Sequence, residues 1–262
     1  MSNVDEARSE YRYKRLLSVQ HRSPSLRAIW KRAYGDDYPE EVMPFGFVTR
    51  WDIERLAREL GVAAGDRFVD IGCGRGGPGL LVAKRTGATL LGIDIVAEAL
   101  AHAEAMRATL GIDAASFRVG TFTNTGLEAE SMDGAMSVDA LWMVKDKRAA
   151  ISEVARCVKR GGRFAFTTWE TGAATSTSRC LATSGGLLDE AGFTVLGHEA
   201  TPNWLDRQLA VYQGIVEHED TLVGELGAEA MATLLLEARE LPEVMRSKAQ
   251  RVIIVAERRA RP

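Results

Sequence analysis

The chain has 262 residues, of which 46% are hydrophobic and 26% are charged, and its formal net charge at pH 7 is -3. This length suits one substantial domain with a small appendage. Such a balanced charge gives no reason to expect a nucleic acid or a membrane as a partner. The three cysteines lack the spacing of metal ligands, so we expect neither a bound metal nor a disulfide framework.

The N-terminal part of the chain is expected to be helical and basic. Helices are predicted over residues 4–19, 24–34 and 50–60, and the second begins with a Ser-Pro pair that suits the N-cap and first helical positions. Tyr11 and Tyr13 add aromatic side chains to the basic segment. Such a surface suits an acidic or aromatic substrate, and the alternative is a solvated helix face. The first six residues lack the basic and apolar regions of a signal peptide, and no apolar run is long enough to span a membrane, so we expect a cytoplasmic protein.

The most informative stretch is residues 68–81, which indicates an apolar strand, a glycine turn and the start of a helix. Gly72, Gly74 and Gly76 remove side chains where a ligand would touch the backbone, and the helix points unpaired N–H groups at the same place. The pattern predicts a site for a nucleotide-like ligand. The glycines alone fit a nicotinamide dinucleotide as well as another adenosine-bearing cofactor.

Two acidic residues favour one class of ligand. Asp70 precedes the first glycine by two positions, and its carboxylate would repel a pyrophosphate but attract an ammonium group. Asp94 ends the next predicted strand, roughly 20 residues past the glycines, where an acid accepts hydrogen bonds from ribose hydroxyls. The alternative role for Asp94 is to cap the following helix.

The order Asp-x-Gly-x-Gly-x-Gly at residues 70–76 resembles motif I of the class I S-adenosylmethionine-dependent methyltransferases. The resemblance implies S-adenosyl-L-methionine as cofactor and S-adenosyl-L-homocysteine as product. In this family, helices before the first strand form a lid, so residues 1–60 are interpreted as an N-terminal helical lid that contacts the substrate. The cofactor contacts expected besides Asp70, Asp94 and the three turn glycines are Cys73, Ile95, Gly120, Thr121, Phe122 and Ser137.

From residue 67 onward, strands and helices alternate in the manner of a parallel sheet covered on both faces. The expected fold is a Rossmann-like, doubly wound, mostly parallel seven-stranded α/β sheet whose last strand is reversed. Its core comprises residues 61–202 and 251–262, and residues 203–250, which include Trp204, form a helical cap insertion. The predicted strands are 67–72, 89–94, 115–121, 133–139, 162–169, 193–200 and 251–257, and the helices among them are 77–86, 96–110 and 147–159.

Two positions depart from the pattern of the resembled family. Thr121 and Phe122 stand where an acid usually faces the adenine amino group, so apolar contact and a hydroxyl or backbone group would hold the adenine. Met143 stands where many O-methyltransferases of this type carry a histidine. Without that base, an amine, an electron-rich carbon or an already ionised oxygen could still attack the methyl group, because none of them must lose a proton during transfer.

The candidate catalytic residues are Asp139, at the end of the fourth strand, and the histidines His198 and His218. Trp142, Met143 and Trp204 are the remaining candidate substrate contacts. The predicted function is methyl transfer to the C, N or ionised O atom of a small molecule, in natural-product biosynthesis. The sequence leaves the oligomeric state open, and a homodimer or larger homo-oligomer is one of the possible states.

Two alternatives to methyl transfer stay open. One is an NAD(P)-dependent oxidoreductase, against which Asp70 and the reversed last strand argue. The other is a protein that keeps the methyltransferase fold but acts as a cyclase or binding module, which the methionine at position 143 favours.

Overall fold

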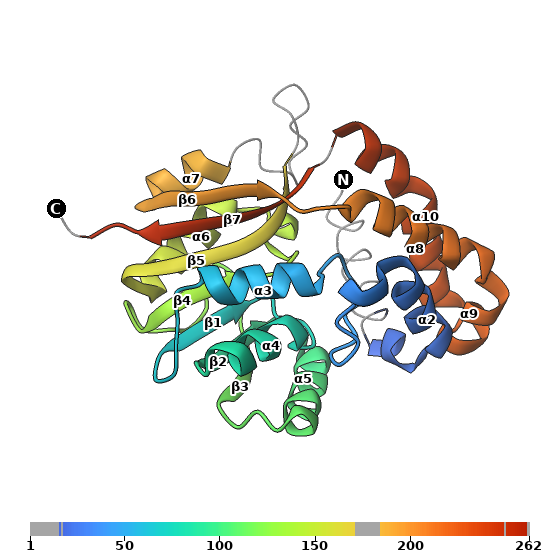
Figure 1. Cartoon of the computed structure of the whole chain (residues 1–262), viewed down its shortest axis with the longest axis horizontal. Coiled ribbons are helices and arrows are strands. Elements are labelled where there is room, and N and C mark those ends of the chain that lie inside the picture. Colours follow the sequence, from blue (N-terminus) through green and yellow to red (C-terminus); the bar gives the residue numbers. More distant parts are fainter. Residues whose placement is uncertain (1–15, 17, 171–183, 249, 261–262) are drawn as a thin grey trace. The chain divides into compact units, whose positions relative to one another are not determined.

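The computed structural model describes residues 16, 18–170, 184–248 and 250–260 (Figure 1). Tyr11 and Tyr13 lie outside the described residues. The chain divides into two compact units. One comprises the sheet and its helices, over Val48–Pro202 and Lys248–Pro262, and the other is helical, over Met1–Phe47 and Asn203–Ser247.

The larger unit is built on a seven-stranded sheet with the order β3-β2-β1-β4-β5-β7-β6. Strands β1 to β5 pair in parallel, and β7 runs antiparallel to both of its neighbours. The predicted Rossmann-like sheet with a reversed last strand is therefore confirmed. The strands are β1 Arg67–Ile71, β2 Thr89–Asp94, β3 Ala115–Val119, β4 Met132–Ser137, β5 Val158–Glu170, β6 Phe193–Ala200 and β7 Gln250–Arg258.

Helices flank this sheet, and the central strands are buried on both faces, which explains their nearly continuous apolar sequences. One core cluster joins the helix between β4 and β5 to the inner strands, with Phe164 and Phe166 stacked at 4.4 Å between ring centroids. The helices of this unit are α3 Arg50–Glu59, α4 Gly77–Thr86, α5 Ala97–Leu110, α6 Lys147–Cys157 and α7 Ser184–Glu190, with a short 3-10 helix η3 at Leu141–Met143.

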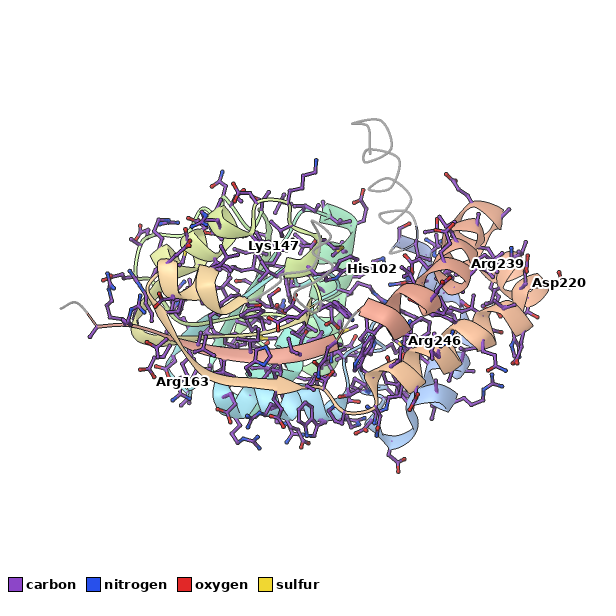
Figure 2. The ribbon with its side chains drawn as sticks, turned by 90° about the horizontal axis from the view of Figure 1, so that it is seen from above. His102, Lys147, Arg163, Asp220, Arg239 and Arg246 are labelled. Carbon is purple, nitrogen blue, oxygen red and sulfur yellow. The ribbon has the colours of Figure 1, made fainter. Side chains whose placement is uncertain are left out.

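Helix α3 belongs to the sheet unit, although the sequence grouped it with the N-terminal region 1–60. It begins with a capping box between Thr49 and Asp52, and it packs on α4 and β5. In β5, Arg163 donates to the backbone oxygen of Glu59 at 3.1 Å (Figure 2). The boundary between the units therefore falls at Val48, because the apolar face of α3 is buried with the sheet.

The connection from α6 to β5 is shorter than predicted. The helix expected over residues 147–159 ends at Cys157, and the strand expected from residue 162 begins at Val158. Val158 is fully buried and pairs with Met132 of β4, and a register irregularity follows before Gly134. Burial of this valine against β4 thus outweighs the helix-ending signal of the basic and glycine residues that follow it.

The smaller unit contains helices from both of its chain segments. Its elements are η1 Gln20–Arg22, α2 Pro24–Tyr34, η2 Gly35–Asp37, α8 Trp204–Glu217, α9 Glu219–Leu226 and α10 Ala228–Lys248. Helix α2 starts where predicted, because the Ser23 side chain accepts from the backbone N–H of Leu26 at 2.9 Å. Helices α2 and α8 pack closely at Gly214, where an added Cβ would lie 2.7 Å from Ile29. In the described part of the chain, no helix is both long and apolar enough to span a membrane.

Candidate functional site

The turn between β1 and α4 uses three glycines for two different reasons. Gly72, Gly74 and Gly76 all have positive φ, at 74°, 53° and 77°. A Cβ at Gly72 would lie 2.5 Å from the Cβ of Ala140, and one at Gly76 would lie 2.9 Å from the Phe117 ring. A Cβ at Gly74 would meet nothing within 4 Å. Close packing therefore requires two of the glycines, whereas the open side of Gly74 leaves its backbone accessible to a ligand.

Asp94 ends β2 and holds this turn in place. Its Oδ2 accepts from the backbone N–H of Gly74 at 2.8 Å, and its Oδ1 accepts from that of Val96 at 2.9 Å. Val96 is itself the N-cap of α5, and no side chain caps this helix, so the alternative role of Asp94 as the helix cap is wrong. A carboxylate offers about four acceptor positions, and these two bonds leave capacity for ribose hydroxyls.

Asp70 lies beneath the turn and is almost completely buried. Burial, followed by the nearby charge of Asp94, raises the pKa of its carboxyl from 3.8 to about 8, although the hydrogen bond with the Gly79 backbone lowers it in part. Its Oδ1 has no hydrogen-bond partner among the described residues. Because buried polar atoms rarely lack partners, this oxygen marks a place where an ammonium donor of a ligand, or a water, fits.

The remaining cofactor candidates surround the same turn or lie on neighbouring strand ends. Ile95 is 48% exposed after β2, as an apolar contact for a ring would be. Gly120 donates to the backbone oxygen of Asp94 at 3.1 Å, and the Phe122 ring lies against Gly72. Thr121 uses its hydroxyl within its own turn, where it accepts from the N–H of Asn124 at 3.0 Å.

Cys73 and Ser137 are buried near these strand ends. Burial, followed by the charges of Asp70 and Asp94, raises the pKa of the Cys73 thiol well above its usual range, so it is an unreactive packing residue. The Ser137 hydroxyl has no hydrogen-bond partner in the described part of the chain. It is a second buried polar group that a ligand or a water can satisfy.

Asp139 follows β4 in the left-handed backbone conformation, with φ of 52°. Arg251 of β7 donates to it from Nε to Oδ1 at 2.9 Å and from Nη2 to Oδ2 at 3.0 Å. The Thr167 hydroxyl donates to Oδ1 at 2.7 Å and accepts from the Asp139 backbone N–H at 2.9 Å. The structure thus places this candidate catalytic carboxylate in a closed hydrogen-bond network.

The short helix η3 follows Asp139 and carries two more candidates, Trp142 and Met143. We call Asp139 and this helix the Asp139 corner. The Trp142 indole N–H donates to the backbone oxygen of Asp139 at 2.8 Å, and its ring meets Trp169 edge to face at 5.5 Å. Trp142 is half-buried, and Met143 is 44% exposed. The corner therefore presents the indole of Trp142 and the thioether of Met143, whereas the carboxylate of Asp139 is already hydrogen-bonded to Arg251 and Thr167.

The two candidate histidines have separate local roles. His198, on the edge strand β6, is about half exposed and lies 2.7 Å from Glu170 through its Nε2. His218 joins α8 to α9, and its Nδ1 lies 2.9 Å from the backbone oxygen of Gly214 at the end of α8. The structure does not bring His198 to the Asp139 corner, since it holds the ring at Glu170.

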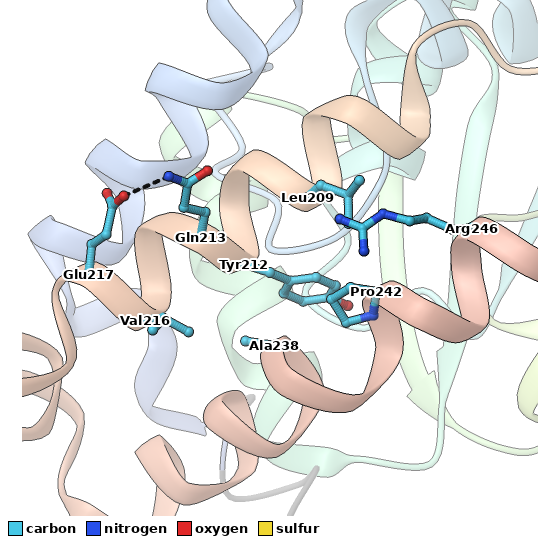
Figure 3. Close-up of a pocket in the computed structure, with 8 residues that line it drawn as sticks. All are labelled: Leu209, Tyr212, Gln213, Val216, Glu217, Ala238, Pro242 and Arg246. Carbon is cyan, nitrogen blue, oxygen red and sulfur yellow. Dashed lines mark hydrogen bonds between the residues drawn. The ribbon is translucent and has the colours of Figure 1, made fainter.

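The helical unit contributes buried aromatic and acidic groups. Trp204 is buried and packs against Phe47, with ring centroids 6.3 Å apart. A groove of about 310 Å³ runs between α8 and α10 (Figure 3). Beside it, Glu237 is half-buried, and burial raises the pKa of its carboxyl to about 7. Its charge contributes to raising the pKa of the buried Tyr212 phenol, for which burial is the larger cause.

Sequence analysis missed Arg251 and its second partner, Asp52. Arg251 is fully buried, and its Nη1 lies 3.0 Å from both carboxylate oxygens of Asp52. The only sequence signal was an arginine directly before the apolar run at residues 252–256. Among the described residues, no group of three His, Cys, Asp or Glu side chains is arranged to hold a metal ion.

Comparisons with known proteins agree with this geometry. Residues 69–166 match a family model described as a methyltransferase domain. The chain is 33% identical over 124 residues to 24-methylenesterol C-methyltransferase 2 of Oryza sativa subsp. japonica, which covers 47% of this chain and 34% of that protein. It thus spans about a third of the length of the first curated relatives that it matches.

Two solved structures share the fold of most of the chain. A putative sarcosine dimethylglycine methyltransferase from Galdieria sulphuraria aligns with a TM-score of 0.72 and 19% identity, over 81% of this chain and 84% of the other. The 4+2 cyclase SpnF aligns with a TM-score of 0.71 and 21% identity, over 80% of each chain.

The glycine turn and its two acids indicate which ligand the site suits. The open backbone of Gly74, the spare acceptor capacity of Asp94 and the unpaired oxygen of Asp70 suit a ligand with an ammonium group and ribose hydroxyls. S-adenosylmethionine carries both of these groups and has no phosphate. Residues 69–166 match the methyltransferase-domain family model, and the site that they form suits S-adenosylmethionine as cofactor.

Proposed function

We propose that this protein transfers a methyl group from S-adenosylmethionine to a small molecule whose nucleophilic atom needs no enzyme base. One observation carries the last part of the proposal. At the end of β4, the carboxylate of Asp139 is committed to Arg251 and Thr167, and Met143 has no ionisable group. Among the described residues, Asp139 and Met143 therefore offer no free proton acceptor next to the glycine turn.

The chain's own residues would hold the cofactor by its polar groups. Asp70 would accept from the ammonium, Asp94 from the ribose hydroxyls, and Gly74 would allow close approach to its backbone. Bound S-adenosylmethionine supplies an electrophilic methyl group on a sulfonium. The enzyme then has chiefly to align the acceptor with that methyl group and to exclude water. Alignment of well-oriented reactants can lower the barrier by about 7 kcal/mol.

The acceptor would be an electron-rich carbon, a neutral amine or an ionised oxygen. Each can attack the methyl carbon without losing a proton in the same step. The half-buried Trp142 suits such a substrate, because an indole face stabilises nearby positive charge on carbon or nitrogen. The similarity to a sterol C-methyltransferase supports the carbon acceptor among these three.

The remaining expectations are part of the same proposal. The N-terminal region, with Tyr11 and Tyr13, and the insertion around Trp204 would supply substrate contacts. The reaction would belong to natural-product biosynthesis in the cytoplasm, with no nucleic acid or membrane as partner. His198 and His218 would serve local structure, because each is already engaged by Glu170 or by the end of α8.

Calorimetry with S-adenosylhomocysteine, NADH and NADPH tests the cofactor, and incubation with methyl-labelled S-adenosylmethionine tests the transfer. A panel of isoprenoid alkenes, amines, phenols and aliphatic alcohols would serve as acceptors. We expect binding of S-adenosylhomocysteine alone, and label transfer to alkenes, amines or phenols but not to alcohols. Transfer to alcohols at neutral pH would contradict the absence of a base. Tight cofactor binding with no transfer to any class would favour the cyclase or binding role.

A further inference from the structure

Arg251 connects three elements that are far apart in the sequence. It lies in β7 with none of its side chain exposed, and it bonds Asp52 in α3 and Asp139 after β4 at the same time. The partners are 199 and 112 residues away along the chain. Burial by itself lowers the pKa of Arg251, but the two carboxylates around its guanidinium together raise it, so the arginine is charged.

The network leaves no freedom in the backbone at Asp139. Arg251 and Thr167 take up the carboxylate, Thr167 accepts from the backbone N–H, and the Trp142 indole donates to the backbone oxygen. A left-handed backbone is unfavourable for a residue other than glycine. The conformation with φ of 52° persists because these bonds determine it.

The corner held in this way touches the cofactor turn. Ala140 follows Asp139, and its Cβ occupies the space that a side chain at Gly72 would need, only 2.5 Å from the ideal Cβ position. On the other side of the corner, Trp142 meets Trp169, and the Arg251 guanidinium lies 5.9 Å from the centre of the Trp169 ring. A displacement of Asp139 would therefore move both Ala140 and the indole.

We propose that Arg251 is a positioning residue for methyl transfer, which acts through Asp139 to fix Ala140 against the glycine turn and Trp142 beside it. Asp52 orients the guanidinium from the opposite side. Asp139 in this arrangement is a structural anion and not a base. This inference rests on the proposed function for its link to the transfer step, and its link to cofactor binding can be measured without turnover.

The chain offers a matched control in the same strand. Arg258 is also buried in β7, but it donates to the backbone oxygen of Val158 and pairs with Glu130 at 3.2 Å, at the opposite end of β4 from Asp139. Removing either arginine should lower the thermal midpoint, because each leaves buried partners unsatisfied. Only Arg251 should affect the cofactor turn.

The experiment is calorimetric binding of S-adenosylhomocysteine to the wild type, Arg251→Met, Arg251→Lys and Arg258→Met, with thermal midpoints measured in parallel. We expect Arg251→Met to weaken binding by roughly tenfold or more, Arg251→Lys to weaken it less because the charge remains, and Arg258→Met to leave it unchanged. If Arg251→Met does not fold, Arg251→Lys and Asp52→Asn carry the comparison. If the Arg251 and Asp52 variants had lower thermal midpoints but bound S-adenosylhomocysteine as tightly as the wild type, the positioning role would be overturned.

A double-mutant cycle tests the path through Ala140. In an Ala140→Gly background the contact with Gly72 is missing, so Arg251→Lys should cost less affinity than it does in the wild type. Strictly additive losses would overturn the path. A wild-type protein that fails to bind S-adenosylhomocysteine would instead overturn the proposed function, and the positioning role with it.

Discussion

The carboxylate of Asp94 accepts a hydrogen bond of 2.8 Å from the backbone N–H of Gly74, across the turn that joins β1 to α4. One side chain thereby links the end of β2 to a glycine that has nothing within 4 Å of its ideal Cβ position. Asp94 has two tasks as a result, because it would contact the ribose and it also holds the backbone that contacts the rest of the cofactor. Replacing it should affect both.

Asp94→Ala should weaken S-adenosylhomocysteine binding by at least about 1.5–3 kcal/mol, the range for losing hydrogen bonds to a charged group. The turn also loses support from the N–H groups of Gly74 and Val96, so the thermal midpoint should fall by a few degrees. Calorimetry and thermal melting check the two effects. Asp113→Ala, which removes an exposed carboxylate before β3, is the control and should change neither. Unchanged affinity in Asp94→Ala would remove this residue from the site.

Gly74→Val should abolish measurable cofactor binding, because a branched side chain would fill the open side of the turn and resist positive φ. Gly111 supplies the control, since it also has positive φ and nothing within 4 Å of its ideal Cβ. Gly111→Val introduces the same backbone strain at the end of α5. We expect similar losses of thermal midpoint in both variants and loss of binding in Gly74→Val only. A Gly74→Val protein that binds normally would contradict the assignment of the turn.

Asp70 should release a proton when the cofactor binds. Burial keeps the pKa of its carboxyl at about 8, so most of it is protonated at pH 7. A bound ammonium stabilises the ionised form and lowers that pKa, which expels the proton. Binding enthalpies measured at pH 7 in phosphate and in Tris should therefore differ, since the two buffers take up protons with different enthalpies. Asp70→Asn should remove the difference, and equal enthalpies for the wild type would disprove the contact.

Glu237→Gln should stabilise the protein at neutral pH. The pKa of Glu237 is raised by burial from 4.5 to about 7, so the unfolded chain loses the proton more readily than the folded one. Its contribution to stability is greatest below pH 4.5 and falls as the pH rises to about 7. The variant should therefore be more stable than the wild type by ~1–3 kcal/mol at pH 7.5, with the difference vanishing near pH 4. Urea unfolding at both pH values checks this, and a constant difference would contradict it.

The pH dependence of kcat/KM should follow the ionisation of the substrate's own nucleophile. Met143→His should change activity with the natural substrate little, and it should permit slow turnover of a hydroxylated analogue. His198→Ala and His218→Ala should keep the pH profile of the wild type, because the His198 ring contacts Glu170 and the His218 ring contacts the backbone at the end of α8. An enzyme group titrating near pH 6.5 that disappears in either alanine variant would show that a histidine is the base after all.

Local sequence signals were sufficient to predict the local structure around the glycine turn. The glycine turn, the strand ends at Asp70 and Asp94, and the Ser-Pro start of α2 each depend on residues within one turn or one strand. The alternation of strands and helices along the chain likewise predicted the doubly wound sheet. These features follow from backbone conformation and chain proximity, which a single sequence encodes directly.

Features that depend on distant pairing escaped the sequence. Arg251 and Asp52 look like ordinary polar residues of a strand and a helix until the fold joins them over 199 residues. For the same reason Asp139 resembled a free catalytic carboxylate. Val158 was assigned to a helix because its pairing with Met132 is set by the sheet and not by its neighbours in sequence.

The position of β7 between β5 and β6 constrains how the chain can fold during synthesis. Strands β5 and β6 are both complete by Ala200, yet neither pairs with the other, and both wait for a strand that begins at Gln250. The ribosome must make α8, α9 and α10 in the interval, while the apolar edge of β5 stays open. Non-local pairings of this kind slow folding and expose strand edges to other chains. Coexpressed chaperones that shield such edges should therefore raise the soluble yield of this protein more than slower translation of its first five strands would.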